Sequence, residues 1–150
     1  MEIKKKNKKI KCLYFVVILI LLFTGFFAYN MFGISFRGDV SNVHKDIETS
    51  QMFETNEIEA AMDVVIDDFK HNFHGCTLKE LRYSDETCLD ASLAWKDEYN
   101  ADKAIVIKSI FDVPDKGASA AFNPGTTYTW YYWVLIFEEN DWIIKNKGMG

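Results

Sequence analysis

The chain has 150 residues, 49% of them hydrophobic, and a net charge of −5 at pH 7. The charge is unevenly distributed, because residues 1–11 carry six lysines against one glutamate, whereas the remainder has 11 basic and 21 acidic side chains. The acidic remainder argues against nucleic-acid binding, which needs a basic surface. The part of the chain that follows the N-terminal segment is long enough to form one hydrophobic core.

Residues 12–29 form an uncharged apolar stretch, CLYFVVILILLFTGFFAY, directly after the basic tail. A transmembrane helix needs about 20 apolar residues to cross a hydrocarbon core of about 30 Å, and the stretch reaches this length by residue 32. Lysines beside such a helix remain on the cytoplasmic side. The sequence therefore predicts a single-pass protein of the cell membrane, with a cytoplasmic tail at 1–11, a transmembrane anchor at 12–36 and an extracellular C-terminal domain.

A cleaved secretory signal peptide also begins with a basic segment. Its apolar core usually spans about 7–15 residues and ends at a cleavage site of small residues. In this chain the core is longer, and the residues at 26–29 are Phe-Phe-Ala-Tyr, which do not form such a site. We therefore favour an uncleaved anchor.

Residues 37–54 are polar and lack periodicity, so we expect a linker there. The folded domain is expected at 55–150 and begins with a helix of roughly 17 residues. Thr55 or Asn56 is the expected N-cap, and Gly75 is the expected stop. One face of this helix is apolar, formed by Ile58, Ala61, Met62, Val65, Ile66, Phe69 and Phe73.

The remaining pattern predicts a short strand at 77–83, a second helix at 85–99, and strands at 104–113, 128–138 and 142–146. A loop at 118–127 and a tight turn at 139–141 connect the last three strands. One main helix followed by hairpin-linked strands predicts an α+β fold, with the helix packed on a curved antiparallel sheet.

The strings Gly-Cys-x-Leu and Asn-Pro-x-x-Thr-Tyr occur within GCTLKELRYSDE (75–86) and NPGTTYTWYYWVLI (123–136). Together with ADKAIVIKSIFDV (101–113) and the segment 142–148, these stretches resemble a family of small extracytoplasmic domains of unknown function in Gram-positive bacteria. Some members are membrane-anchored proteins, and others lie at the end of membrane metallopeptidases of the β-lactam-sensor type. The resemblance implies a cystatin-like or NTF2-like shape and no assigned activity.

Two aromatic residues depart from the family pattern, which tends to have polar residues at Trp130 and Tyr132. Because side chains alternate across a strand, these two rings share one face, whereas Tyr131 and Trp133 share the other. Exposed aromatic surface often marks contact with a partner. We predict a partner-binding patch at Trp130 and Tyr132, with Asn123 at its rim; additional core packing is the alternative.

His71, His74 and Cys76 form an H-x-x-H-x-C string, with Cys88 downstream. Zinc accepts such ligands, but their spacing matches no standard zinc module, so we expect no metal site. A disulfide between Cys76 and Cys88 is conceivable in an exported domain. A straight strand at 77–83 would hold the two sulfurs too far apart, so we favour two free thiols, with Cys76 buried.

No catalytic signature of the common hydrolase, metalloprotease or nucleotide-binding families is present. Acidic residues that could act as a general base are Asp67, Asp68, Asp112 and Asp115. The sequence thus favours a membrane-anchored binding or sensing domain without catalytic activity or cofactor, whose partner is an envelope protein or peptide. The alternative is a small NTF2-like hydrolase or isomerase with an Asp or His directed into the fold.

Overall fold

The computed structural model describes residues 14–27, 37–116, 118 and 121–149. The chain divides into two compact units, Met1–Ile34 and Ser35–Gly150. In the first unit, residues 14–27 form a helix whose side chains are all exposed. No helix within the described ranges combines the length and the apolar character needed to cross a membrane. The predicted tail at 1–11 and both ends of the predicted anchor, 12–13 and 28–36, lie outside the described residues.

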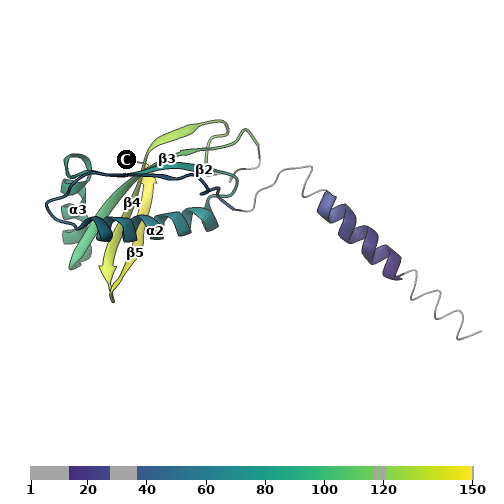
Figure 1. The fold of residues 1–150 in the computed structure, drawn as a ribbon, viewed down its shortest axis with the longest axis horizontal. Helices are drawn as coiled ribbons and strands as arrows, with labels where there is room; N and C mark the ends of the chain where they lie inside the picture. The colour runs from purple at the N-terminus through teal and green to yellow at the C-terminus, as the bar shows by residue number, and fades with distance from the viewer. Residues whose placement is uncertain (1–13, 28–36, 117, 119–120, 150) are drawn as a thin grey trace, which may run out of the picture. The chain divides into compact units, whose positions relative to one another are not determined.

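The second unit is an α+β domain built on a five-stranded sheet with strand order β1-β2-β3-β4-β5 (Figure 1). The elements along the chain are β1 (His44–Ile47), α2 (Thr55–Asn72), β2 (Thr77–Tyr83), α3 (Asp85–Tyr99), β3 (Lys103–Asp112), β4 (Thr127–Glu138) and β5 (Asp141–Met149). The predicted α+β class is confirmed. The sheet is mixed, because β1 pairs with β2 in parallel whereas the other neighbours are antiparallel. The prediction of a wholly antiparallel sheet is therefore wrong.

Residues 37–54, where the sequence predicts a linker, contain β1 and lie against the domain. Asp39 forms an isolated bridge with Thr77, and β1 continues this parallel pairing from His44. Gly38 lies so close to α2 that a Cβ at this position would be 2.5 Å from the backbone oxygen of Phe69. The strand escapes sequence analysis because it is only four residues long and only Ile47 in it is apolar.

Helix α2 covers one face of the sheet, and its predicted apolar side is confirmed as its buried side. The N-cap is Glu54, one residue before Thr55 and two before Asn56, the two predicted caps, and the Glu57 side chain accepts a hydrogen bond from the Glu54 N–H (3.0 Å). Beyond its last turn, the ring of Phe73 lies 5.7 Å from that of Tyr131 and 5.2 Å from that of Trp133, centroid to centroid. Aromatic rings thus fill the space between α2 and the sheet.

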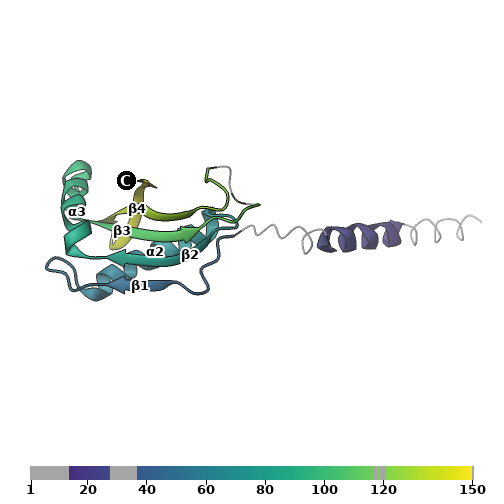
Figure 2. The same cartoon turned by 90° about the horizontal axis from the view of Figure 1, so that it is seen from above.

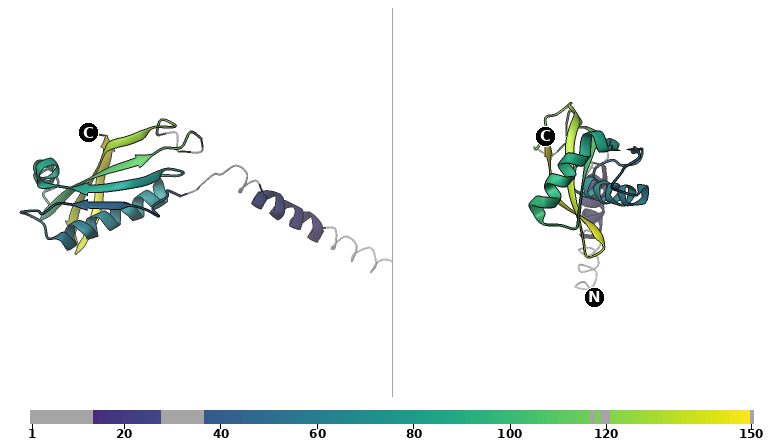
Figure 3. Two further views of the ribbon diagram at one scale, coloured as in Figure 1. Left: turned by 45° about the horizontal axis from the view of Figure 1, so that its top comes forward. Right: turned by 90° about the vertical axis from the view of Figure 1, so that its left-hand side faces the viewer.

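Helix α3 packs on the opposite face, at one end of the sheet (Figures 2 and 3). Strand β2 ends at Tyr83, so it does not extend along the part of β3 around Val106. The Val106 N–H instead donates a hydrogen bond to the hydroxyl of Ser92 on α3 (2.9 Å), and this hydroxyl donates to the Cys88 carbonyl (2.8 Å). Ser92 therefore fixes α3 on β3. Among the described residues, no other helix covers this face of the sheet.

Candidate functional site

Two hollows lie on the part of the sheet that α3 leaves open. The larger, which we call the α3–β5 groove, has a volume of about 360 Å³ and is lined by Thr87, Ala91, Trp95, Val106, Tyr132, Val134, Asn146, Lys147, Gly148 and Met149. The smaller, which we call the Lys108 hollow, has a volume of about 180 Å³ and is lined by Glu80, Arg82, Thr87, Lys108, Ile110, Thr129 and Trp130. Thr87 lines both hollows, so they adjoin at the start of α3.

Trp130 and Lys108 line the Lys108 hollow, and Tyr132 lines the α3–β5 groove. Trp130 is 61% exposed, whereas Tyr132 is half-buried. The ammonium of Lys108 lies 5.1 Å from the ring centroid of Trp130 and 5.3 Å from that of Tyr132, within the range of cation–π attraction. The two predicted aromatic residues therefore lie on one face, and they share a lysine that the sequence analysis does not single out.

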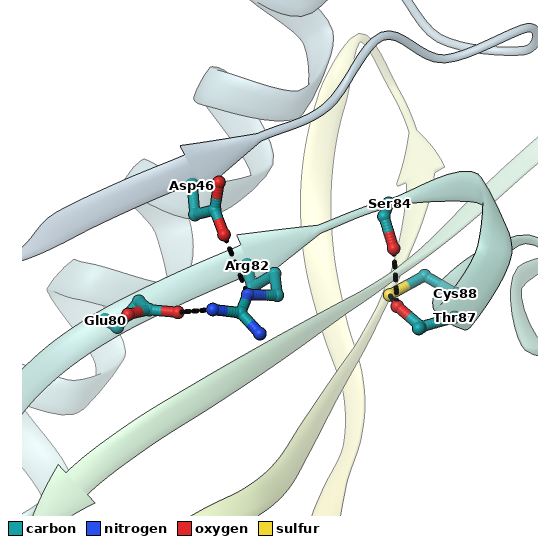
Figure 4. Close-up of polar contacts among 6 residues, drawn as sticks. All are labelled: Asp46, Glu80, Arg82, Ser84, Thr87 and Cys88. Carbon is teal, nitrogen blue, oxygen red and sulfur yellow. Dashed lines mark hydrogen bonds and ion pairs between the residues drawn. The ribbon is translucent and has the colours of Figure 1, made fainter.

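Charge is distributed unequally around these hollows. The guanidinium of Arg82 pairs with Asp46 (2.8 Å) and Glu80 (2.6 Å), as Figure 4 shows. The nearby Glu80 carboxylate raises the pKa of Arg82 above its ordinary value. Lys108 is only 9% exposed, yet it forms no ion pair or hydrogen bond through its ammonium with any residue that the structure describes. The stem of Lys108 is thus largely buried, while its ammonium reaches solvent and pairs with no carboxylate that the structure describes.

Asn123 is exposed in the loop before β4 and lines neither hollow. Its backbone N–H donates a hydrogen bond to the hydroxyl of Tyr128 (3.1 Å), and the Tyr128 ring stacks on Phe111 at 5.0 Å. Phe111 belongs to the core under α2. Asn123 is thus held next to residues on the α2 side of the sheet, while Trp130 and Tyr132 lie on the other side.

Both cysteines of the domain are free and buried. Burial raises the pKa of the Cys76 thiol to about 11, which leaves little reactive thiolate at neutral pH. The ring of His71 contacts Asp67 on the preceding turn of α2 (Nδ1–O 2.7 Å to the carbonyl), and His74 is exposed. Within the described ranges, no group of three His, Cys, Asp or Glu side chains could hold a metal ion.

The four acidic candidates do not form a common site. Asp68 pairs with Lys147 of β5, and the Asp67 side chain lies 3.5 Å from His71. Asp112 pairs with Lys79 (3.2 Å), and a hydrogen bond from the Thr127 hydroxyl lowers its pKa. Asp115 is exposed, near Gly125. Each of these carboxylates is exposed or only partly buried, so none is directed into an enclosed interior as the predicted general base would be.

No protein-family model, curated protein or solved structure matches the chain. The resemblance to small extracytoplasmic domains therefore stays a prediction, as do the cystatin-like and NTF2-like shapes. The site must be interpreted from its own geometry.

Proposed function

We propose that the chain is a membrane-anchored, extracytoplasmic binding or sensing domain without catalytic activity, whose partner contacts Trp130 and Tyr132. The observation that carries this proposal is the 61% exposure of Trp130 on β4, two residues before Tyr132, which is paired with strands on both sides. Large aromatic side chains dominate the binding energy of protein interfaces, and exposed apolar patches mark such interfaces. We expect the partner to be an envelope protein or peptide.

The aromatic patch is also preorganised. Tyr132 lies opposite Lys108 on β3 and opposite Gly148 on β5, so its backbone is held from both sides. The rings of Trp130 and Tyr132 both contact the Lys108 ammonium. Side chains that are already ordered lose less conformational entropy on binding, which favours affinity.

The membrane anchor in this proposal rests on the sequence, because the basic tail at 1–11 precedes an apolar stretch without a cleavage site. A protease added to intact cells should remove a tag at the C-terminus of the full-length chain and leave a tag at the N-terminus untouched. Release of a shortened protein into the medium would instead show that the stretch is a cleaved signal peptide.

The proposed binding face can be tested by photo-crosslinking in the native cell. The photoreactive residue p-benzoylphenylalanine replaces Trp130 in one variant and Met52, which is 44% exposed outside the patch, in a matched control. After irradiation, intact-mass measurement should show a discrete adduct at position 130 that is missing at position 52. Equal adducts at both positions, or no adduct at position 130, would contradict the proposed binding face.

A further inference from the structure

Five residues form one row across the sheet. In the strand register, Asp46 of β1 lies opposite Arg82 of β2, Arg82 opposite Lys108 of β3, Lys108 opposite Tyr132 of β4, and Tyr132 opposite Gly148 of β5. Residues directly opposite each other on paired strands point to the same face. The row therefore crosses the face that α3 leaves open, from the Lys108 hollow to the α3–β5 groove.

The cationic position of this row is Lys108. Arg82 is already neutralised by Asp46 and Glu80. The ammonium of Lys108 contacts the rings of Trp130 and Tyr132 and forms no ion pair with any residue that the structure describes. Lys108 lines the Lys108 hollow and its ammonium is accessible to solvent, so it is available to pair with an anion that enters this hollow.

The apolar position of the row is the α3–β5 groove. Trp95 of α3 and Val134 of β4 contribute apolar walls to it, and Val106 lies at its floor. At the β5 end, Gly148 has no side chain, and a Cβ at this position would meet no atom within 4 Å. The groove is therefore unobstructed at the edge strand, where a ligand can extend beyond it.

The distance from β3 to β5 and the single unpaired ammonium indicate which kind of ligand fits the row. Neighbouring strands lie about 4.8 Å apart, so the path from β3 to β5 is roughly 10 Å, which three residues of extended peptide span at about 3.3 Å each. One ammonium matches one carboxylate, whereas a phosphate carries about −1.5 to −2 charges and needs more donors. We infer that the row binds the last three residues of a peptide with an apolar C-terminus, placing its carboxylate on Lys108 and its side chains in the α3–β5 groove. This inference rests on the proposed function, whose binding face it shares.

The inference is tested by affinity selection on the full-length chain. The probe is a pool of N-acetylated tripeptides with Leu, Ile, Val or Phe at the last two positions, prepared once as free acids and once as C-terminal amides. The free acids should be retained about tenfold or more over the amides, because a charge-assisted hydrogen bond is lost in the amide. Octanoate, an apolar acid without a peptide backbone, should compete only weakly.

Three variants identify the contacts. Lys108→Met keeps the apolar stem and should abolish the preference for free acids, whereas Lys145→Met, which removes an exposed lysine from β5, should preserve it. Gly148→Leu should fill the groove and reduce retention of the acids at least tenfold. Thermal unfolding of each variant verifies that it is folded.

Equal retention of acids and amides by the wild type, or an undiminished preference in Lys108→Met, would overturn the inference. Strong competition by octanoate would overturn its peptide part. These outcomes can be distinguished from failure of the proposed function. If position 130 gives a discrete crosslink while acids and amides are retained equally, the binding face stands. Only the inference that it binds a peptide C-terminus is then rejected.

Discussion

Arg82 and Lys108 lie directly opposite each other on β2 and β3, but only Arg82 is paired with carboxylates. Like charges in opposite positions destabilise a sheet. Asp46 and Glu80 offset the charge of Arg82, whereas Trp130 and Tyr132 partly offset that of Lys108. Lys108 therefore adds a like charge opposite Arg82 that no carboxylate among the described residues pairs with.

This unequal pairing predicts opposite effects of two matched substitutions. Lys108→Met keeps the apolar stem and removes one of the two like charges, so the free energy of unfolding should stay equal or rise by up to about 1 kcal/mol. Arg82→Met leaves Asp46 and Glu80 without their cation and should lower it by about 1 kcal/mol. Urea denaturation measures both changes. A loss above about 1 kcal/mol in Lys108→Met would mean that the lysine is structural.

Two glycines provide a test of how residues 37–54 pack on the domain. An added Cβ at Gly38 would collide with the backbone oxygen of Phe69, whereas at Gly148 it would enter open space. Gly38→Ala should therefore lower the free energy of unfolding by about 1–3 kcal/mol, and Gly148→Ala should leave it unchanged or raise it slightly. Equal stability of the two variants would show that the segment before β1 is not packed on α2.

The sequence predicts α2 from its periodic apolar face, and β2 to β5 from short runs bounded by turn residues. Helix α3 has no comparable apolar face, because its buried residues are Cys88 and Ser92. The sequence does not predict β1, where His44, Lys45 and Asp46 give no apolar pattern and only pairing with β2 creates the strand. The N-cap is similarly set by a side-chain contact of Glu57 rather than by residue type alone.

Only the aromatic residues of the site can be predicted from the sequence, because the rest of it depends on strand pairing. Alternation along β4 places Trp130 and Tyr132 on one face, but Lys108 is hidden within the apolar run AIVIKSIF. A single lysine in a buried β-branched run is the available signal. Its relation to Tyr132 and Gly148 depends on the register between three strands, which a single sequence does not specify.

Asp85 should make the domain sensitive to acid. Hydrogen bonds from the Gln51 N–H (2.7 Å) and the Ser50 hydroxyl (2.7 Å) lower the pKa of Asp85 below its ordinary value of 3.8. Because the folded-state pKa is lowered, this stabilisation is complete above the ordinary pKa and disappears as the pH falls through the folded-state pKa. The difference in thermal midpoint between wild type and Asp85→Asn should be largest near neutral pH and should shrink below about pH 4.

The matched control for this prediction is Asp90→Asn, which changes an exposed carboxylate on the same helix. Its thermal midpoint should follow that of the wild type at every pH. If the difference in thermal midpoint between the wild type and Asp85→Asn stays constant down to the lowest pH, the aspartate acts through its shape rather than its charge.

The buried thiols should be unreactive until the domain unfolds. Iodoacetamide should leave Cys76 and Cys88 unmodified in the folded chain, because both are buried and the pKa of Cys76 is raised to about 11. In denaturant without reductant, peptide mapping should find both alkylated. Ser41→Cys, at an exposed position, serves as a positive control that reacts in the folded chain. A peptide that links the two cysteines and is two hydrogens lighter would contradict the free thiols.

We propose that Trp130 and Tyr132 serve binding, whereas Tyr131 and Trp133 are buried in the core. The most direct test is the thermal midpoint of the double variant Trp130→Ala, Tyr132→Ala, compared with that of Tyr131→Ala, Trp133→Ala. The thermal midpoint of the first double variant should stay within about 5 °C of that of the wild type. Trp130 is largely exposed, and a cation–π contact is worth about 1 kcal/mol. The second should lose its cooperative transition, since each buried aromatic truncation costs about 3–5 kcal/mol. Equal loss of structure in both variants would contradict the account, because both ring pairs would then belong to the core.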